Sequence, residues 1–286
     1  MREVLVISGK GGTGKTTLVA ALTCFKNDIV VADCDVDAPD LHLLLKPEVE
    51  REFEFKGEEI AYIDKKLCKQ CGVCISVCQF DAISDDYVVD EFSCEGCGVC
   101  EWMCPAKSIV MKERIQGKYF ISSIKAGKMV HAQLFPGAEN SGKLVTKVKN
   151  LAREVATEEK AEGILIDGAP GIGCPVIASL SRVNLALIVT EPTVSGVHDL
   201  KRIVELAEFF KIKVKVIINK FDLNILKTEE IEDYCRSKRI SVVSKIPFYY
   251  EMIEALNRGL SIVEYSSNPE ILNPYEDISR EIWEGE

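Results

Sequence analysis

Apolar residues are concentrated in short runs that are separated by longer amphipathic stretches. A short apolar run between polar or glycine-containing segments is typical of a buried strand. The runs that we interpret as strands are Val4–Ser8, Ile29–Ala32, Gly163–Asp167, Leu185–Thr190, Val214–Ile218 and Val242–Ile246. The stretches that we interpret as helices are Thr16–Phe25, Leu144–Thr157 and Leu200–Phe210. Strands alternating with helices predict an α/β fold with a doubly wound, mostly parallel sheet and helices on both faces.

This alternation is interrupted between residues 60 and 112, where cysteines and glycines replace the apolar runs. We therefore expect one main domain, formed by residues 1–59 and 113–286, and a small insert formed by residues 60–112. After the insert, Lys118–Ser123 and Lys128–Leu134 alternate apolar and polar residues like two short strands. The surrounding segment, Gly117–Lys143, has two interpretations: a hairpin and loop that cover the sheet, or a loop that docks a partner.

Length, net charge and cysteine content limit which classes of protein and partner the sequence allows. A chain of 286 residues can bury the core of one large domain with an insert. The net charge of −10 disfavours nucleic acids and anionic membranes as partners. The chain begins directly in a strand, without the pattern of a signal peptide, and no apolar stretch approaches the ~20 residues of a membrane span. We expect a cytoplasmic protein whose twelve cysteines are metal ligands before they are disulfides.

The segment between the first strand and the first helix has the sequence S-G-K-G-G-T-G-K-T-T. It fits G-x-x-x-x-G-K-[ST], the phosphate-binding loop (P-loop). Its glycines let backbone N–H groups close around phosphate oxygens, and the helix N-terminus adds partial positive charge. We expect Lys15 to reach the β- and γ-phosphates and the Thr16 hydroxyl to bind Mg²⁺. The nucleotide-binding residues predicted here are Gly9, Lys10, Gly11, Gly12, Thr13, Gly14, Lys15, Thr16 and Thr17.

Acidic residues follow two other predicted strands. Asp33, Asp35 and Asp37 come after the second strand, and Asp167 ends the strand that precedes a Gly/Pro-rich loop. The carboxyl ends of parallel strands are the edge at which ligands bind in α/β sheets. The sequence therefore predicts that these carboxylates lie near the bound phosphates.

Two cysteine repeats occupy the insert. Residues 68–78 and 94–104 each fit C-x-x-C-x-x-C-x-x-x-C, and Pro105 follows the second repeat. The spacing does not suit tetrahedral zinc, which uses paired C-x-x-C units. It resembles the bacterial two-cluster ferredoxin, in which the fourth cysteine binds the other cluster. The resemblance implies one 4Fe–4S cluster on Cys68, Cys71, Cys74 and Cys104, and a second on Cys78, Cys94, Cys97 and Cys100.

The P-loop carries a second lysine, Lys10, and so resembles the deviant loop K-G-G-x-G-K-[ST] of the MinD/Mrp/nitrogenase-iron-protein superfamily. The Asp33–Asp35 segment resembles the D-A-D switch of the Mrp-type iron–sulfur carriers, and the loop from Asp167 resembles the D-x-P-P-G switch II. Together these motifs imply a P-loop ATPase of the MinD/Mrp superfamily with an inserted small α+β ferredoxin domain. In that architecture residues 1–59 and 113–286 form the ATPase domain.

The resemblance also implies roles for individual residues. Lys10, Lys15 and Asp35 would be catalytic, with Lys10 reaching the nucleotide of the partner subunit in a nucleotide-dependent homodimer and Asp35 positioning the attacking water. Thr16, Asp33 and Asp167 would hold Mg²⁺. The cofactors implied are ATP or ADP, Mg²⁺ and the two 4Fe–4S clusters.

Two further segments are predicted to contact the base of the nucleotide. Asn219-Lys220-Phe221-Asp222 fits the N-K-x-D motif, in which the aspartate of GTPases reads guanine and the asparagine of MinD-type proteins contacts adenine. Pro247 begins a loop on the same side. The motif alone does not separate the two bases, but the two-lysine loop favours ATP over GTP.

Three functions are compatible with these motifs. The first is ATP-gated electron transfer to a redox partner. The second is assembly or carriage of iron–sulfur clusters or metallocofactors for a client protein. The third is a redox-responsive nucleotide switch that recruits partners. The Mrp-type carriers hold a bridging cluster on a C-x-x-C, whereas the ATPase domain here offers only Cys24, Cys34, Cys174 and Cys235, which are not so paired.

Overall fold

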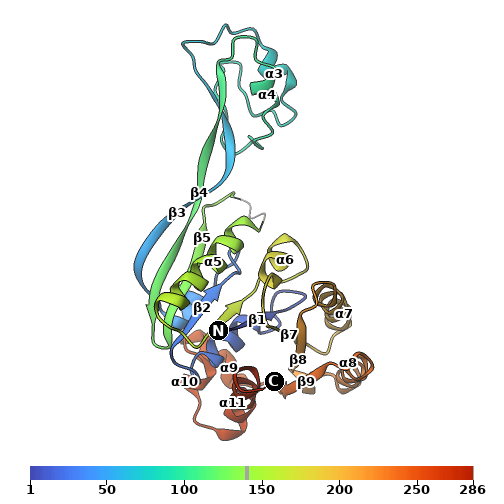
Figure 1. The fold of residues 1–286 in the computed structure, drawn as a ribbon. Coiled ribbons are helices and arrows are strands. Elements are labelled where there is room, and N and C mark those ends of the chain that lie inside the picture. The colour runs from blue at the N-terminus through green and yellow to red at the C-terminus, as the bar shows by residue number, and fades with distance from the viewer. Residues whose placement is uncertain (139–141, 286) are drawn as a thin grey trace. The chain divides into compact units, whose positions relative to one another are not determined.

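A nine-stranded sheet, in the order β3-β4-β5-β2-β6-β1-β7-β8-β9, organises the described residues, which are 1–138 and 142–285 of this computed structural model (Figure 1). From β5 to β9 every neighbouring pair is parallel, which confirms the predicted mostly parallel sheet. The strands are β1 (Arg2–Ile7), β2 (Ile29–Asp33), β3 (Glu48–Ile63), β4 (Ile109–Ile124), β5 (Gly127–Leu134), β6 (Gly163–Asp167), β7 (Leu185–Thr190), β8 (Lys213–Asn219) and β9 (Ser241–Ile246).

Helices cover both faces of the parallel part, because its strands are buried on both sides. On one face α1, α9, α10 and α11 share a core with side chains such as Val4, Leu165 and Leu187. Helix α5 packs on β2 and β6, helix α6 packs on β1, and the two helices pack on each other. The helices are α1 (Lys15–Leu22), α2 (Leu41–Leu45), α3 (Val73–Val77), α4 (Val99–Trp102), α5 (Lys143–Glu158), α6 (Cys174–Leu180), α7 (Val194–Phe209), η1 (Phe221–Leu223), α8 (Ile225–Lys238), α9 (Tyr250–Asn257), α10 (Ile262–Tyr265) and α11 (Pro269–Trp283).

The chain divides into two compact units. The first comprises Met1–Phe53, Tyr119–Gln133 and Asn140–Glu286, and the second comprises Glu54–Lys118 and Leu134–Glu139. The chain passes from one unit to the other within β3 and β4. The insert expected at residues 60–112 lies inside the second unit.

Several elements differ from the sequence prediction, among them α7 and β3. Helix α7 begins at Val194, not at Leu200, because the Thr193 hydroxyl caps it by accepting a hydrogen bond from the Gly196 N–H. Strand β3, which is 16 residues long, was not predicted. No helix among the described residues is long and apolar enough to cross a membrane.

Candidate functional site

The P-loop lies at the carboxyl end of β1, and α1 begins within it at Lys15. Gly12 and Gly14 have φ angles of 78° and 93°, which glycine adopts at little cost. A β-carbon on Gly14 would lie 2.4 Å from Nδ2 of Asn219. That Nδ2 donates to the Thr13 carbonyl oxygen at 2.8 Å. The glycines are therefore required by the backbone conformation and by the close approach of the residue that ends β8.

Carboxylates from two neighbouring strands close the site. Strands β2 and β6 are paired so that Asp33 lies opposite Asp167 at their carboxyl ends. The Lys15 ammonium donates to Asp167 Oδ1 at 2.7 Å and to Asp35 Oδ2 at 3.2 Å. It also lies 3.3 Å from the Thr16 hydroxyl oxygen. The structure thus brings together the residues that the sequence assigned to the phosphates, the magnesium ion and the attacking water.

Burial controls the charge of this cluster. Desolvation raises the pKa of Asp33 well above its usual range, and the adjacent Asp167 raises it further, against the effect of Lys15. Desolvation likewise raises the pKa of Asp167, although Lys15 opposes it. Burial alone would lower the pKa of Lys15, but Asp167 and Asp35 together raise it. The lysine is therefore the counter-charge of a buried acidic group.

The donor set of this cluster fits a magnesium ion. The Oδ2 atoms of Asp33 and Asp167 are buried and accept no hydrogen bond from the part of the chain that the structure describes. Buried polar atoms normally have a partner, and hard carboxylate oxygens are the protein ligands that Mg²⁺ prefers. These two oxygens, and the Thr16 hydroxyl 3.3 Å from the Lys15 ammonium, are atoms that could hold the metal.

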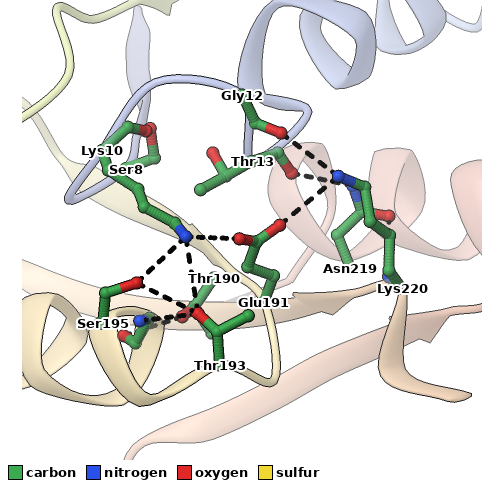
Figure 2. Close-up of polar contacts among 11 residues, drawn as sticks. Ser8, Lys10, Gly12, Thr13, Thr190, Glu191, Thr193, Ser195, Asn219 and Lys220 are labelled. Carbon is green, nitrogen blue, oxygen red and sulfur yellow. Dashed lines mark hydrogen bonds and ion pairs between the residues drawn. The ribbon is translucent and has the colours of Figure 1, made fainter. Parts of the chain in front are cut away.

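Lys10 contacts a different set of side chains from those that surround Lys15 (Figure 2). Its ammonium contacts Glu191 Oε1 at 2.5 Å and donates to Ser195 Oγ at 3.0 Å, both in its own chain. Lys220 donates to the other Glu191 oxygen at 3.3 Å. Partial burial would raise the pKa of Glu191, but the hydrogen bond from Lys10 and the charge of Lys220 outweigh it and lower that pKa.

A cavity of about 300 Å³ adjoins the P-loop on the base side. The predicted base-side residues Asn219, Lys220 and Pro247 all line it, together with Gly12 and Gly14. Phe248, in the predicted base-side loop after β9, also lines it. Sequence reasoning missed most of the remaining apolar wall, which comes from the residue before α9, from α9 and from α11. These additional lining residues are Tyr249, Met252, Ile253, Leu256 and Tyr275.

Asp222, the last residue of the N-K-x-D motif, is not among the residues that line this cavity. Its Oδ1 accepts a hydrogen bond from the Phe248 backbone N–H at 2.8 Å. The carboxylate therefore holds the loop that begins at Pro247 against η1, the short helix that follows β8.

The second unit contains both cysteine repeats, and each repeat forms one short helix, α3 or α4. Gly72 and Gly98 precede these helices at φ angles of 79° and 72°. Two cavities lie beside the helices, and each is lined by three cysteines of one repeat and by the fourth cysteine of the other. The cysteines are Cys68, Cys71, Cys74 and Cys104 in one cavity and Cys78, Cys94, Cys97 and Cys100 in the other.

Backbone amides face sulfur atoms at equivalent places in the two repeats. The Ala82 N–H donates to Cys78 Sγ and the Ser108 N–H donates to Cys104 Sγ, both at 3.4 Å. Burial would raise the pKa of Cys104, but hydrogen bonds from the Ser108 hydroxyl and backbone outweigh it and lower that pKa. The thiolate form, which binds metals, is thereby favoured at Cys104.

All twelve cysteines are free thiols. Within residues 1–138 and 142–285, no group of three or more His, Cys, Asp or Glu side chains is placed so that it could hold a metal ion. A zinc site requires donors that converge on one ion, whereas the four cysteines of a 4Fe–4S cluster each bind a different iron. The cysteine lining therefore fits the donor set of such a cluster, although the thiols do not converge as they would on zinc.

The segment Gly117–Lys143 is only partly described, because residues 139–141 of its predicted loop lie outside the described residues. Its remaining residues belong mostly to β4 and β5. His131 is packed within it: its ring stacks on Phe120 and its Nε2 lies 2.8 Å from the Ser122 hydroxyl. None of the residues that line the base-side cavity comes from this segment.

Comparisons with known proteins agree with this geometry. The family described as "CobQ/CobB/MinD/ParA nucleotide binding domain" matches residues 4–262. An uncharacterised protein of Methanocaldococcus jannaschii is 38% identical over 225 residues, which are 78% of this chain and 79% of that protein. MinD of Pyrococcus horikoshii, complexed with Mg-ADP, superposes with a TM-score of 0.60 at 16% identity over 98% of this chain and 95% of that one. The MinC:MinD cell division protein complex of Aquifex aeolicus superposes with a TM-score of 0.60 at 20% identity. The match covers 100% of this chain and 96% of that one.

The two solved structures share the fold with this chain, and the family match covers most of its length. The predicted α/β P-loop fold is therefore confirmed. P-loop ATPases of the MinD/ParA family hydrolyse ATP. The chain belongs to the CobQ/CobB/MinD/ParA family of nucleotide-binding domains and is an ATPase.

Proposed function

We propose that this ATPase is an iron–sulfur protein that couples its nucleotide state to electron transfer. One observation carries the proposal: each of the two cavities of the second unit is lined by all four cysteines of one predicted ligand set. Cys104 joins the set of the first repeat, and Cys78 joins the set of the second. This crossed arrangement is the one that two-cluster ferredoxins use, and it arises from cysteines that are distant in sequence.

Each cavity would hold one 4Fe–4S cluster. A bound cluster would supply a site that accepts and releases one electron at a time. The chain itself supplies eight thiolates, the amide hydrogen bonds to Cys78 and Cys104, and an apolar surround that includes Ile83 and Ile109. Hydrogen bonds to sulfur and a low local dielectric are two factors that set a cluster's potential.

At the nucleotide site, backbone amides of residues 9–17 would surround the phosphates, with Lys15 on the β- and γ-phosphates. Thr16, Asp33 and Asp167 would hold Mg²⁺, directly or through water. Asp35 would orient the attacking water. The 2.7 Å and 3.2 Å contacts of Lys15 support these roles, because the lysine ammonium lies directly beside the Asp167 and Asp35 carboxylates.

The geometry of Asp222 favours ATP over GTP. A guanine-reading aspartate must present its carboxylate to the base, but Asp222 accepts from the Phe248 N–H and is absent from the cavity lining. Asp222→Asn should therefore weaken ATP binding modestly, through the loop, and should not create affinity for xanthosine triphosphate. A gain of xanthosine triphosphate binding would show that Asp222 reads the base.

We further propose a nucleotide-dependent homodimer in which Lys10 acts on the nucleotide of the partner subunit. A second cation at the γ-phosphate would stabilise charge that develops during hydrolysis. The Aquifex aeolicus relative occurs in a complex with MinC, so a docked protein partner has precedent in this fold. For this chain the proposed partner is a redox protein.

Iron analysis of anaerobically purified protein tests the iron–sulfur proposal. We expect about eight irons per chain. Cys104→Ser should lose about four of them and keep the others, and Cys174→Ser, at an exposed cysteine outside both sets, should lose none. Zinc in place of iron, or an iron content that Cys104→Ser leaves unchanged, would overturn the proposal. Rapid transfer of the iron to an apo-ferredoxin would favour cluster assembly over electron transfer.

A further inference from the structure

Glu191 joins two lysines from different sides of the nucleotide site (Figure 2). It follows β7, and its side chain is only 14% exposed. One carboxylate oxygen contacts Lys10 at 2.5 Å and the other contacts Lys220 at 3.3 Å. Both of these contacts are made within a single chain.

The position of Lys10 depends on this carboxylate. Its ammonium also lies within 3.0 Å of Ser195 Oγ and 3.4 Å of Thr193 Oγ1, the cap of α7. The N-terminus of a helix carries partial positive charge, which disfavours a cation. Glu191 therefore supplies the charge that keeps Lys10 beside α7.

Lys220 connects Glu191 to the nucleotide cavity. It lines that cavity and donates to the Gly12 carbonyl oxygen at 3.2 Å. A base or ribose that enters the cavity meets Lys220, and ATP phosphates in the loop place negative charge close to Lys10. Both events compete with contacts that Glu191 makes.

We propose that Glu191 is a positioning residue that retains Lys10 within its own subunit and thereby restrains formation of the ATP-dependent homodimer. The inference rests on the proposed function, in which Lys10 acts on the partner's nucleotide. ATP weakens the restraint because it binds better to the arrangement in which Lys10 is released, and a ligand shifts an equilibrium only through such a difference.

Two measurements test the restraint. The first is the rate at which an amine-labelling reagent modifies Lys10 without added nucleotide, read by mass spectrometry. The second is the dissociation constant of the dimer with ATP, measured by light scattering in an Asp35→Ala background that blocks hydrolysis. Glu191→Gln should increase the labelling rate and tighten the dimer, each by about threefold to tenfold. Glu208→Gln is the matched control, because Glu208 lies on α7 and pairs with Lys238 at 3.1 Å.

Unchanged labelling of Lys10, or a weaker dimer, in Glu191→Gln would overturn the inference. If the parent protein forms an ATP-dependent dimer and Glu191→Gln does not change its dissociation constant, the inference is wrong but the proposed dimer stands. Absence of an ATP-dependent dimer from every variant would overturn the proposed dimer and this inference with it. Adding Lys10→Gln should abolish the gain of Glu191→Gln, and a gain that persists without Lys10 would show that Glu191 acts by another route.

Discussion

Replacing Lys15 by alanine should abolish tight nucleotide binding and also destabilise the protein before any nucleotide is added. The Lys15 side chain is 6% exposed and its partners Asp167 and Asp35 are 1% and 13% exposed. Asp33 belongs to the same buried group. Removing the lysine leaves these carboxyl groups without a counter-charge. Breaking a buried ion pair by removing one partner costs about 3–5 kcal/mol, so we expect a loss of that size in the free energy of unfolding.

Urea and thermal unfolding without nucleotide measure this loss. For a domain of this size the melting temperature should fall by roughly 6–15 °C. The matched control is Lys26→Ala, which removes a lysine paired with Glu162 at the surface and should cost at most about 1 kcal/mol. Adding Asp167→Asn to Lys15→Ala should restore part of the stability, because a neutral amide needs no counter-charge, and it should not restore ATP binding.

The argument fails if Lys15→Ala unfolds at the same urea concentration as the parent and Lys26→Ala. It also fails if Asp167→Asn lowers stability equally with and without Lys15. In either case the buried carboxyl groups would not depend on the lysine for their stability.

Three further predictions follow from individual contacts. Asp35→Ala should bind ATP in calorimetry but release phosphate about 10²–10⁴-fold more slowly, and normal turnover would remove Asp35 from the mechanism. Lys149→Met should cost about 1–3 kcal/mol in urea unfolding, because the Lys149 ammonium donates to backbone carbonyl oxygens at the C-terminal end of α6, including that of Ser181 at 2.7 Å. Burial lowers the pKa of His131 to about 4, so the unfolded chain takes up the proton first as the pH falls below ~6.5. The free energy of unfolding should then decrease by about 2–3 kcal/mol between pH 6.5 and 4, measured by urea unfolding at each pH. His131→Gln should lack this part of the decrease. His198→Gln, a control at an exposed site, should retain it.

The nucleotide site could be located from the sequence because its residues mark the ends of apolar runs. In a parallel sheet the carboxyl ends of the strands share one edge, so Lys15, Asp33 and Asp167 had to be neighbours once β1, β2 and β6 were adjacent. The grouping of the cysteines around two cavities could be predicted for a different reason: their spacing repeats, and a known ligand rule crosses between the repeats. Both predictions needed only local pattern and one rule of assembly.

Features that depend on distant residues could not be predicted in the same way. Glu191 is 181 positions away from Lys10, and no motif links the two. The apolar wall of the base-side cavity comes from α9 and α11, whose sequences look like ordinary amphipathic helices. Strand β3 was missed because most of its side chains, such as Glu50 and Glu52, are exposed, and its buried apolar residues are few: Phe55, Ala61 and Ile63. Charged edge strands of this kind protect a sheet from pairing with other chains.

The nucleotide site and the cysteines are connected by a short route along the chain. After Asp33 and Asp35 the chain continues through α2 into β3 and enters the second unit. It returns along β4 into β5, which pairs with β2 so that Val130 lies opposite Ala32. If the Asp35 segment moves during hydrolysis, the movement would act on a covalent connection to the second unit and, through β2, on β5, the strand that follows the return. Coupling requires that ATP and ADP differ in affinity for two arrangements of this segment. A reduction potential of the proposed clusters that changes between the two nucleotides would measure that difference directly.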